Sequence, residues 1–299
     1  MLRTLTSLGL VFSLSSLAAV AAAEPAPVVG GSSVPYGTWP DVVAVLGRDA
    51  ACTGTLIAPD VVLTAGHCIE MNPVEVIVDT VDFGKPGGDR IKVKWSRAYP
   101  DWEHRYDVGI VMLDHVARPA PRPIAAVCTA NARVTPGAKV QVVGFGLTTR
   151  SGTGFNTRLH QAAIPVADAT CADDASCEPS IAPNGEFIAG GDGSDACFGD
   201  SGGPAMIDSG HGFAVAGVVS RGLALPGAPC GNGGVYVRAD KVVAWIQNVT
   251  GRRLARTTCD RPGDAPDSAE DDAGGCSTGG GSEVGALALV LVVLRRRRR

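Results

Sequence analysis

Short valine-rich runs separated by turn residues are the feature that most restricts how this chain can fold. They recur through the middle of the sequence, at residues 41–47, 61–66, 74–81, 91–95, 108–113, 139–146, 213–220 and 235–239. Glycine is frequent, with 39 residues, and aromatic residues make up only 5% of the chain. Many short strands at this spacing predict an all-β sandwich or barrel. The one clear helical pattern, at 241–249, is followed by a glycine.

The N-terminal segment has the features of an export signal. An arginine precedes an apolar stretch, and Ala21-Ala22-Ala23 supplies small residues for cleavage. We expect a signal peptide at 1–23 and a short propeptide at 24–27. Export would place the nine cysteines in an oxidising compartment, where most of them should be paired.

The C-terminal segment divides into two parts. Residues 251–283 are rich in Asp, Gly, Ser and Pro, which is typical of a flexible linker. Residues 284–299 contain an apolar run, about half the roughly 20 residues that a spanning helix needs, and end in arginines. The order GGCSTGG, apolar run, arginines resembles the sorting tails of myxobacterial surface proteins. This resemblance implies that an envelope peptidase processes the tail at Cys276; a merely unstructured tail is the alternative.

A serine in the stretch CFGDSGGPAM, residues 197–206, is a candidate nucleophile. A serine hydroxyl needs a base to accept its proton and an acid to orient that base. His67 is the base candidate, because Cys68 beside it can be held by a disulfide to Cys52. The other four histidines are interpreted as surface residues. Asp107 is the acid candidate because it begins an apolar strand, where a carboxylate is costly unless paired; a turn aspartate is the alternative.

Several motifs occur together in a familiar order. They are VVGG at 28–31, LTAGHC at 63–68, DVGIVML at 107–113, GFG at 144–146, GDSGGP at 199–204, VVSRG at 218–222 and GGVYV at 233–237. Over residues 28–250 the chain therefore resembles the trypsin/chymotrypsin family of serine endopeptidases. The resemblance implies two six-stranded antiparallel β-barrels packed together with a C-terminal helix. The order His, Asp, Ser also differs from that of α/β-hydrolases, in which the serine comes first.

The resemblance implies a role for each residue of the catalytic site. Ser201 would attack the scissile carbonyl, His67 would accept and return the proton, and Asp107 would orient His67. The backbone N–H groups of Gly199 and Ser201 would form the oxyanion hole.

Substrate selection is implied by Asp195, which matches the base of the family's primary specificity pocket. An aspartate there pairs with the Arg or Lys that precedes the cleaved bond. Gly222 and Gly234 match the pocket walls, and Ser220 and Gly222 would pair with an extended substrate. An exposed loop aspartate is the alternative reading of Asp195.

Activation is implied by Asp200, whose family counterpart binds an N-terminal ammonium freed by proteolysis. Here that terminus would be Val28, so the chain is expected to be a zymogen. Pro27 precedes it, which disfavours activation by a trypsin-like enzyme. Stepwise removal of residues 24–27 by a dipeptidyl peptidase is one route, and a passive spacer is the alternative.

Two features depart from the family pattern. Arg221 stands where the family usually has tryptophan, which would weaken apolar subsites and favour acidic substrate residues nearby. The family's bridges correspond to Cys52–Cys68 and Cys197–Cys230, whereas the usual partner position of Cys171 holds Ile188. Cys171 is therefore expected to pair with Cys177, which leaves Cys128 and Cys259 as a further pair.

The sequence thus predicts a secreted or cell-surface serine endopeptidase that acts on polypeptides after Arg or Lys, as a monomer. The net charge of −4 gives no indication of nucleic-acid binding. We expect neither cofactor nor metal, and interpret Glu70, Glu75 and Asp79 as acidic surface residues, although some relatives bind calcium at this place. An inactive relative that serves as a binding module, or an esterase, is the alternative.

Overall fold

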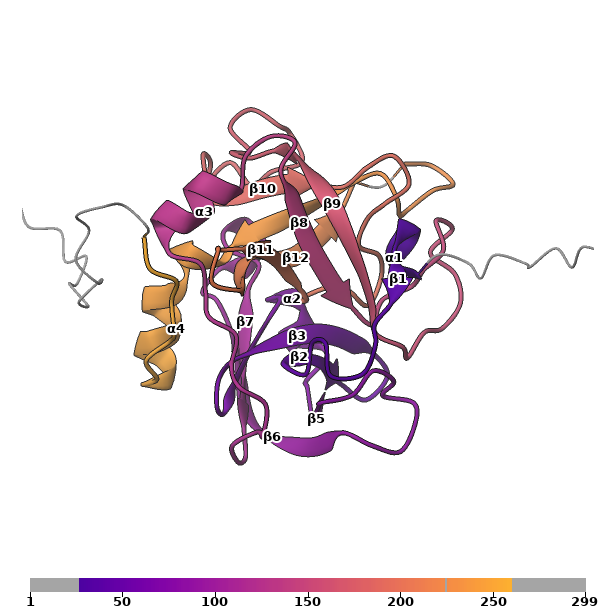
Figure 1. Cartoon of the computed structure of the whole chain (residues 1–299), viewed down its shortest axis with the longest axis vertical. Coiled ribbons are helices and arrows are strands. Elements are labelled where there is room, and N and C mark those ends of the chain that lie inside the picture. Colours follow the sequence, from indigo (N-terminus) through magenta and orange to yellow (C-terminus); the bar gives the residue numbers. More distant parts are fainter. Residues whose placement is uncertain (1–26, 224, 260–299) are drawn as a thin grey trace, which may run out of the picture. The chain divides into compact units, whose positions relative to one another are not determined.

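Two six-stranded antiparallel barrels form the core of the described chain (Figure 1). The computed structural model describes residues 27–223 and 225–259. The first barrel closes in the order β2-β3-β4-β7-β6-β5. Its strands are β2 (Val42–Leu46), β3 (Ala51–Ala58), β4 (Val61–Thr64), β5 (Glu75–Val78), β6 (Asp89–Ala98) and β7 (Gly109–Leu113).

The second barrel has the order β9-β10-β13-β12-β11-β8 and closes through pairing of β8 with β9. Its strands are β8 (Lys139–Gly144), β9 (His160–Asp168), β10 (Glu186–Ala189), β11 (Pro204–Asp208), β12 (Phe213–Gly222) and β13 (Gly234–Arg238). A short strand, β1 (Ser32–Ser33), adds to β9, and α1 (Pro27–Gly30) precedes it. The fold predicted from the sequence is confirmed.

Valine-rich strands are buried on both faces where the barrels meet. Every residue of β4, β7 and β13 is buried. One apolar cluster joins Leu63 and Ile110 of the first barrel to Val218 and Val237 of the second. Each such side chain contributes about 1.5–3 kcal/mol when fully buried. Strand β6 instead alternates between exposed residues and residues that are buried or half-buried along its first half, which places one face in solvent.

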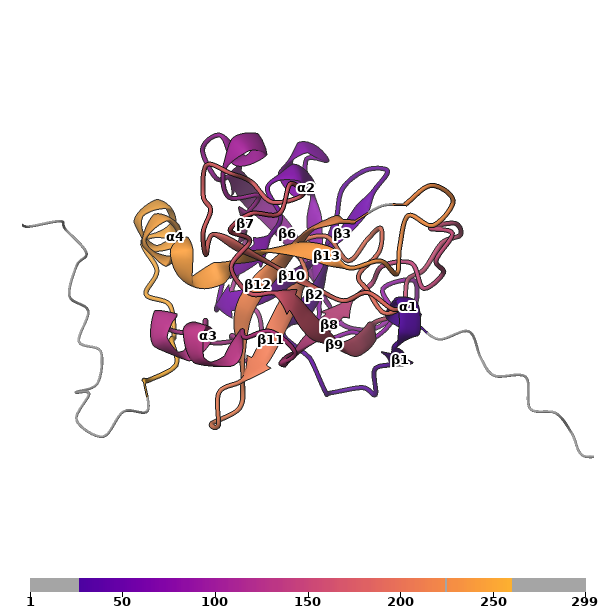
Figure 2. The same ribbon diagram turned by 90° about the horizontal axis from the view of Figure 1, so that it is seen from above.

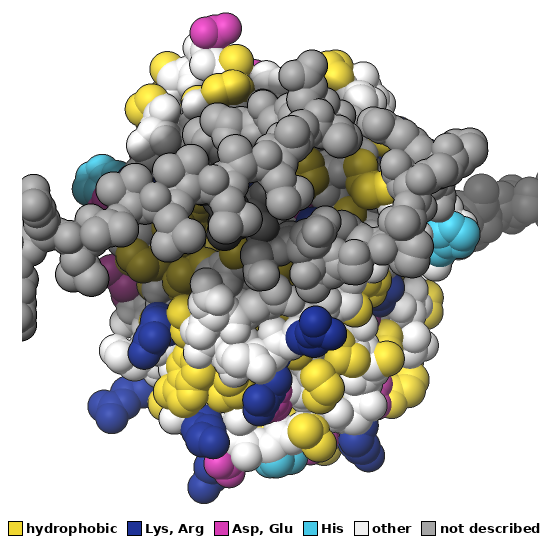
Figure 3. Space-filling model, turned by 90° about the vertical axis from the view of Figure 1, so that its left-hand side faces the viewer, with side chains coloured by type: hydrophobic (Ala, Val, Ile, Leu, Met, Phe, Trp, Pro, Cys, Tyr) yellow, Lys and Arg dark blue, Asp and Glu magenta, His cyan; other side chains and the backbone are white. Residues whose placement is uncertain are grey.

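The C-terminal helix packs across the two barrels. The helix predicted at 241–249 is α4 (Val243–Thr250), preceded by the 3₁₀ turn η2 (Ala239–Lys241). Gly251 ends it with a left-handed φ of 66°. Trp245 contacts Tyr99 of the first barrel, with ring centroids 5.1 Å apart. Figure 3 shows the face on this side of the molecule, where hydrophobic side chains are scattered among basic and polar ones.

A second helix, α3 (Val127–Arg133), lies on the same side as α4 in both views (Figures 1 and 2). A disulfide joins its Cys128 to Cys259, beyond α4. The predicted signal peptide, residues 24–26 of the propeptide, and the tail with Cys276 lie outside the described residues. Within the described ranges, no helix is long and apolar enough to cross a membrane.

Candidate active site

Pairing of β4 with β7 brings His67 and Asp107 together. Thr64 at the end of β4 pairs with Gly109 at the start of β7. His67 begins the short helix α2 (His67–Glu70) just after β4, and Asp107 lies just before β7. The two side chains meet through His67 Nδ1 and Asp107 Oδ2, 2.9 Å apart. The backbone N–H of His67 also donates to Asp107 Oδ1 at 3.0 Å.

Asp107 is buried and fully provided with hydrogen bonds. It is 7% exposed, and the Ser220 hydroxyl on β12 donates to its Oδ2 at 2.7 Å. Burial opposes ionisation, but the hydrogen bonds and charge of His67 together with the Ser220 hydroxyl lower the pKa of Asp107 below its usual value. Sequence reasoning gave Ser220 only a backbone role, because the contact between its side chain and Asp107 crosses from one barrel to the other.

Gly66 allows the tight packing behind His67. A Cβ at this position would lie 2.8 Å from Trp102 and 3.0 Å from Asp107 Oδ1. Trp102 covers this side of the site, with its ring centroid 6.2 Å from that of His67. A larger residue at position 66 would therefore push Asp107 away from His67.

Ser201 lies where the second barrel meets the first. Its carbonyl accepts the Thr53 N–H at 2.9 Å and lies 3.7 Å from Cys68 Sγ. The next residue, Gly202, has a φ of +79°, and a Cβ there would collide with the Thr64 hydroxyl. This close approach explains the glycine that follows the serine and brings Ser201 beside the segment that carries His67.

The Ser201 hydroxyl has no hydrogen bond to any residue that the structure describes. Catalytic hydrogen bonds are often long or poorly aligned without substrate and tighten in the Michaelis complex. With His67 Nδ1 donating to Asp107, Nε2 is the nitrogen left to act as an acceptor. In this tautomer, His67 Nε2 can accept a proton from a hydroxyl that comes within hydrogen-bonding distance.

Two backbone N–H groups near Ser201 are free to bind an anion. Thr53 donates its hydroxyl to the Gly199 carbonyl at 2.8 Å, which fixes that peptide group. The N–H groups of Asp200 and Gly202 bind carbonyls at 2.9 and 2.8 Å, whereas those of Gly199 and Ser201 bind no group in the described part of the chain. Thr53 was not predicted, since its role depends on contact between the barrels.

Asp195 is buried beside several glycines of the second barrel. It is 1% exposed, and neither of its carboxylate oxygens has a well-formed hydrogen bond within the described residues. A Cβ on Gly234 or Gly190 would lie 3.2 or 3.3 Å from its Oδ1. Gly222 pairs with Gly234 across β12 and β13. Because these residues are glycines, no side chain from them covers the carboxylate.

The electrostatics of Asp195 are unusual for a carboxylate. Burial raises its pKa to about 7; the backbone N–H of Ala196 lowers it, while the charge of Asp200 adds to the rise. A buried carboxylate is costly unless it is paired, and a nearby cation would lower that cost.

Asp200 is completely buried and accepts hydrogen bonds from the N–H groups of Gly146, at 2.8 Å, and Cys197, at 2.9 Å. Burial raises its pKa to about 7. Val28 is also fully buried, in the core of the second barrel. The Val29 carbonyl accepts the Asp195 N–H at 3.0 Å. The start of the described chain is thus docked beside Asp195.

The interpretation of all other histidines as surface residues was wrong for one of them. His160 is 5% exposed, and its Nδ1 lies 3.2 Å from the Asn156 amide. Burial lowers its pKa to about 4, so it is neutral at pH 7. It starts β9, on a face that the sequence pattern did not mark as buried.

Four disulfides are formed, which is typical of exported proteins. They join Cys52 to Cys68, Cys128 to Cys259, Cys171 to Cys177, and Cys197 to Cys230, the pairs expected from the sequence. Two groups of possible metal ligands occur among the described residues: Cys52, His67 and Cys68, and Cys171, Cys177 and Glu186. In both groups the sulfurs are bonded to each other and are not thiolate ligands.

Comparison with known proteins agrees with this geometry. A sequence model of the trypsin family matches residues 28–246. The chain is 31% identical over 239 residues to human (Homo sapiens) transmembrane protease serine 5, covering 74% of this chain and 51% of that protein. It is 28% identical over 247 residues to pig (Sus scrofa) coagulation factor XII, covering 75% of this chain and 39% of that protein. The chain thus spans about half or less of these relatives. Together with the two barrels, the match shows that the chain belongs to the trypsin family.

Proposed function

We propose that this protein is a secreted or cell-surface endopeptidase that cleaves peptide bonds after arginine or lysine. The observation that carries the proposal is the meeting of two barrels at one site. His67 and Asp107 come from the first barrel, and Ser201 is bound to that barrel through Thr53. The four disulfides support an oxidising compartment.

The mechanism follows from the roles that these groups can take. Ser201 Oγ attacks the scissile carbonyl as His67 Nε2 accepts its proton. The oxyanion of the tetrahedral intermediate accepts hydrogen bonds from Gly199 and Ser201 N–H. His67 then returns the proton to the leaving amine. Water hydrolyses the acyl-enzyme by the same route, while Asp107 stabilises the imidazolium.

Selectivity for arginine and lysine rests on Asp195. Its buried carboxylate lacks a well-formed internal partner among the described residues, and a guanidinium or ammonium would supply one. A neutral or acidic substrate side chain would leave the carboxylate unpaired.

Activation requires, in this proposal, a new N-terminus at Val28. Its ammonium would bind Asp200, a fully buried carboxylate whose described hydrogen bonds come only from backbone N–H groups. Protein that starts at Val28 should be active and protein that starts at Glu24 should be inactive. An active enzyme with Glu24 as its mature N-terminus would contradict this route.

A panel of chromogenic peptides tests the function. The peptides carry Arg, Lys, Phe, Leu or Asp before the cleaved bond, and the protein starts at Val28. We expect cleavage only after Arg and Lys, and none by the Ser201→Ala variant. Cleavage after Phe or Leu alone would contradict the specificity. Equal activity of the Ser201→Ala variant would contradict the mechanism.

A further inference from the structure

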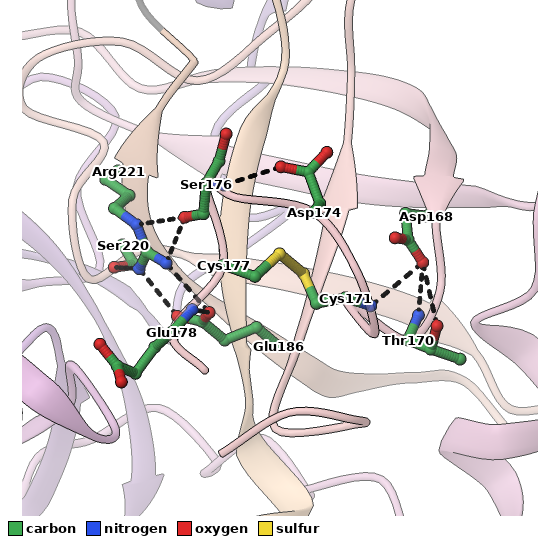
Figure 4. The surroundings of a disulfide bond; sticks show 10 residues. All are labelled: Asp168, Thr170, Cys171, Asp174, Ser176, Cys177, Glu178, Glu186, Ser220 and Arg221. Carbon is green, nitrogen blue, oxygen red and sulfur yellow. Dashed lines mark hydrogen bonds and ion pairs between the residues drawn. A yellow bond between two sulfur atoms is a disulfide. The ribbon is translucent and has the colours of Figure 1, made fainter. Parts of the chain in front are cut away.

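Arg221 and Glu186 form an ion pair next to the catalytic carboxylate. Arg221 lies near the end of β12, and its Nη1 and Nη2 donate to Glu186 Oε1 and Oε2 at 2.7 and 3.0 Å. Glu186, the first residue of β10, is 1% exposed. Such two-pronged contacts between a guanidinium and a carboxylate are geometrically specific. The pair therefore holds the guanidinium in one orientation (Figure 4).

The remaining donors and acceptors of this pair are also used. Arg221 Nε and Nη2 donate to the Ser176 carbonyl at 3.1 and 2.7 Å. Ser176 lies within the small ring closed by Cys171 and Cys177. The Glu178 N–H donates to Glu186 Oε2 at 2.7 Å. The charge of Arg221 is thus matched by that of Glu186, which weakens its attraction for an acidic substrate residue.

The Ser220 hydroxyl connects the Arg221–Glu186 pair to Asp107. Arg221 Nη1 donates to Ser220 Oγ at 3.1 Å, and Ser220 Oγ donates to Asp107 Oδ2 at 2.7 Å. A hydroxyl has a single proton and rotates to suit its partners. Since the guanidinium occupies its acceptor side, the proton of Ser220 is directed to Asp107. Asp107 Oδ2, the oxygen that accepts this proton, also binds His67 Nδ1.

We propose that Arg221 and Glu186 are positioning residues that orient Ser220 toward Asp107 and set the charge felt by the His67–Asp107 pair. This inference rests on the proposed function, because it concerns the same catalytic site. A lone positive charge here would disfavour the imidazolium form of His67, and a lone negative charge would favour it. The two single substitutions should therefore have opposite effects on pH dependence.

Other charged groups lie near the Arg221–Glu186 pair, and they are the same in all the variants to be compared. Asp174 and Glu178 lie on the same connection as Ser176, and Asp174 accepts the Ser176 N–H at 2.8 Å. From the first barrel, the His104 carbonyl accepts the Ser180 hydroxyl. A hydrogen bond to Asp101, its charge, and more distant Glu103 and Glu178 raise the pKa of His104. Differences between variants at Arg221 and Glu186 are measured against this fixed background.

The test measures kcat and KM against pH with an arginyl peptide. The variants are Arg221→Met, Arg221→Lys, Glu186→Gln and the Met/Gln double variant. Arg252→Met is the matched control, since Arg252 pairs with Asp60 and has no contact with a site residue in the described part of the chain. Thermal unfolding verifies that each variant folds. If Arg221→Met does not fold, Arg221→Lys still tests the role of Arg221.

We expect the acidic limb of kcat/KM to move roughly half a pH unit upward in Arg221→Met and downward in Glu186→Gln. The double variant should return toward the wild-type midpoint. In Arg221→Met, kcat should fall roughly tenfold with little change in KM, because the catalytic geometry loosens. Arg221→Lys should recover part of that loss, and Arg252→Met should change neither quantity.

If the acidic limb moves in the same direction in Arg221→Met and Glu186→Gln, or does not move, the inference is overturned. The Arg221–Glu186 pair then has a purely structural role. A change confined to KM would instead make Arg221 a substrate contact. If the wild-type protein cleaves no peptide, the proposed function fails by itself. The positioning is then tested by the NMR resonance of the proton between His67 and Asp107. That resonance should still move in opposite directions in the two single variants.

Discussion

Two buried aspartates of this protein have opposite surroundings. Asp107 accepts hydrogen bonds from His67 and Ser220, and its pKa is lowered. Asp195 has no well-formed hydrogen bond within the described chain, and burial raises its pKa to about 7. Both are almost inaccessible, at 7% and 1% exposure. Burial alone therefore does not decide the behaviour of a carboxylate. The chain supplies side-chain partners for Asp107, whereas the proposed function gives Asp195 a cationic partner from the substrate.

The largest expected effect comes from removing the charge of Asp107. Asp107→Asn should lower kcat about 10⁴-fold, because an amide can favour the wrong tautomer of His67. The measurement is kcat for an arginyl peptide at the pH optimum, with thermal unfolding as the control for folding. A loss smaller than about tenfold would separate Asp107 from the mechanism.

The second-largest effect is expected from removing the charge of Asp195. Asp195→Asn should lower kcat/KM for arginyl peptides about 10²–10³-fold, because the substrate cation loses its buried partner. Asp192→Asn, an exposed acid of the same loop, is the matched control and should change little. Equal losses in the two variants would mean that general negative charge, and not the pocket, attracts the substrate.

The third effect concerns pH and uses an aryl amidine as a cationic probe. With a pKa of about 7, Asp195 is mostly protonated at pH 6 and mostly ionised at pH 8. Affinity should therefore rise about tenfold between these pH values, measured by calorimetry on the Ser201→Ala protein. Asp195→Asn should abolish the rise. Equal affinity at both pH values would show that Asp195 is already ionised at pH 6.

The smallest effect is on stability, and its sign differs between the two aspartates. The raised pKa of Asp195 means that the folded chain binds its proton more tightly, so this group lowers stability as pH rises from about 4 to about 7. Asp195→Asn should therefore melt above wild type at pH 8 and close to it at pH 4. Asp107 has a lowered pKa, so its contribution is present at neutral pH and lost in acid. Asp107→Asn should melt below wild type at pH 8, and scanning calorimetry on both variants measures the contrast.

Much of this organisation could be predicted from the sequence. The recurring valine-rich runs predicted an all-β sandwich or barrel, because strands buried on both faces need apolar residues throughout, and the family resemblance narrowed this to two barrels. The motif order pointed to His67, Asp107 and Ser201 as one group. The pairing of Thr64 with Gly109 gives the physical reason that the first two meet.

Contacts between distant segments could not be predicted. The Ser220 hydroxyl reaches Asp107 from the other barrel, and Thr53 supports both Ser201 and Gly199. Arg221 was expected to favour acidic substrate residues, yet Glu186 on a neighbouring segment of the second barrel matches its charge. No local pattern marks such partners, because they are set by how strands far apart in sequence pack. The acid preference itself stays a prediction, which peptides varied near that subsite can test.

Labelling with a fluorophosphonate tests the central claim most directly, namely that His67 and Asp107 activate the Ser201 hydroxyl. Mass spectrometry of protein starting at Val28 locates the label. The account predicts modification of Ser201 alone, none in Ser201→Ala, and labelling at least about 10³-fold slower in His67→Ala. Labelling of a different serine, or an unchanged rate in His67→Ala, would contradict it.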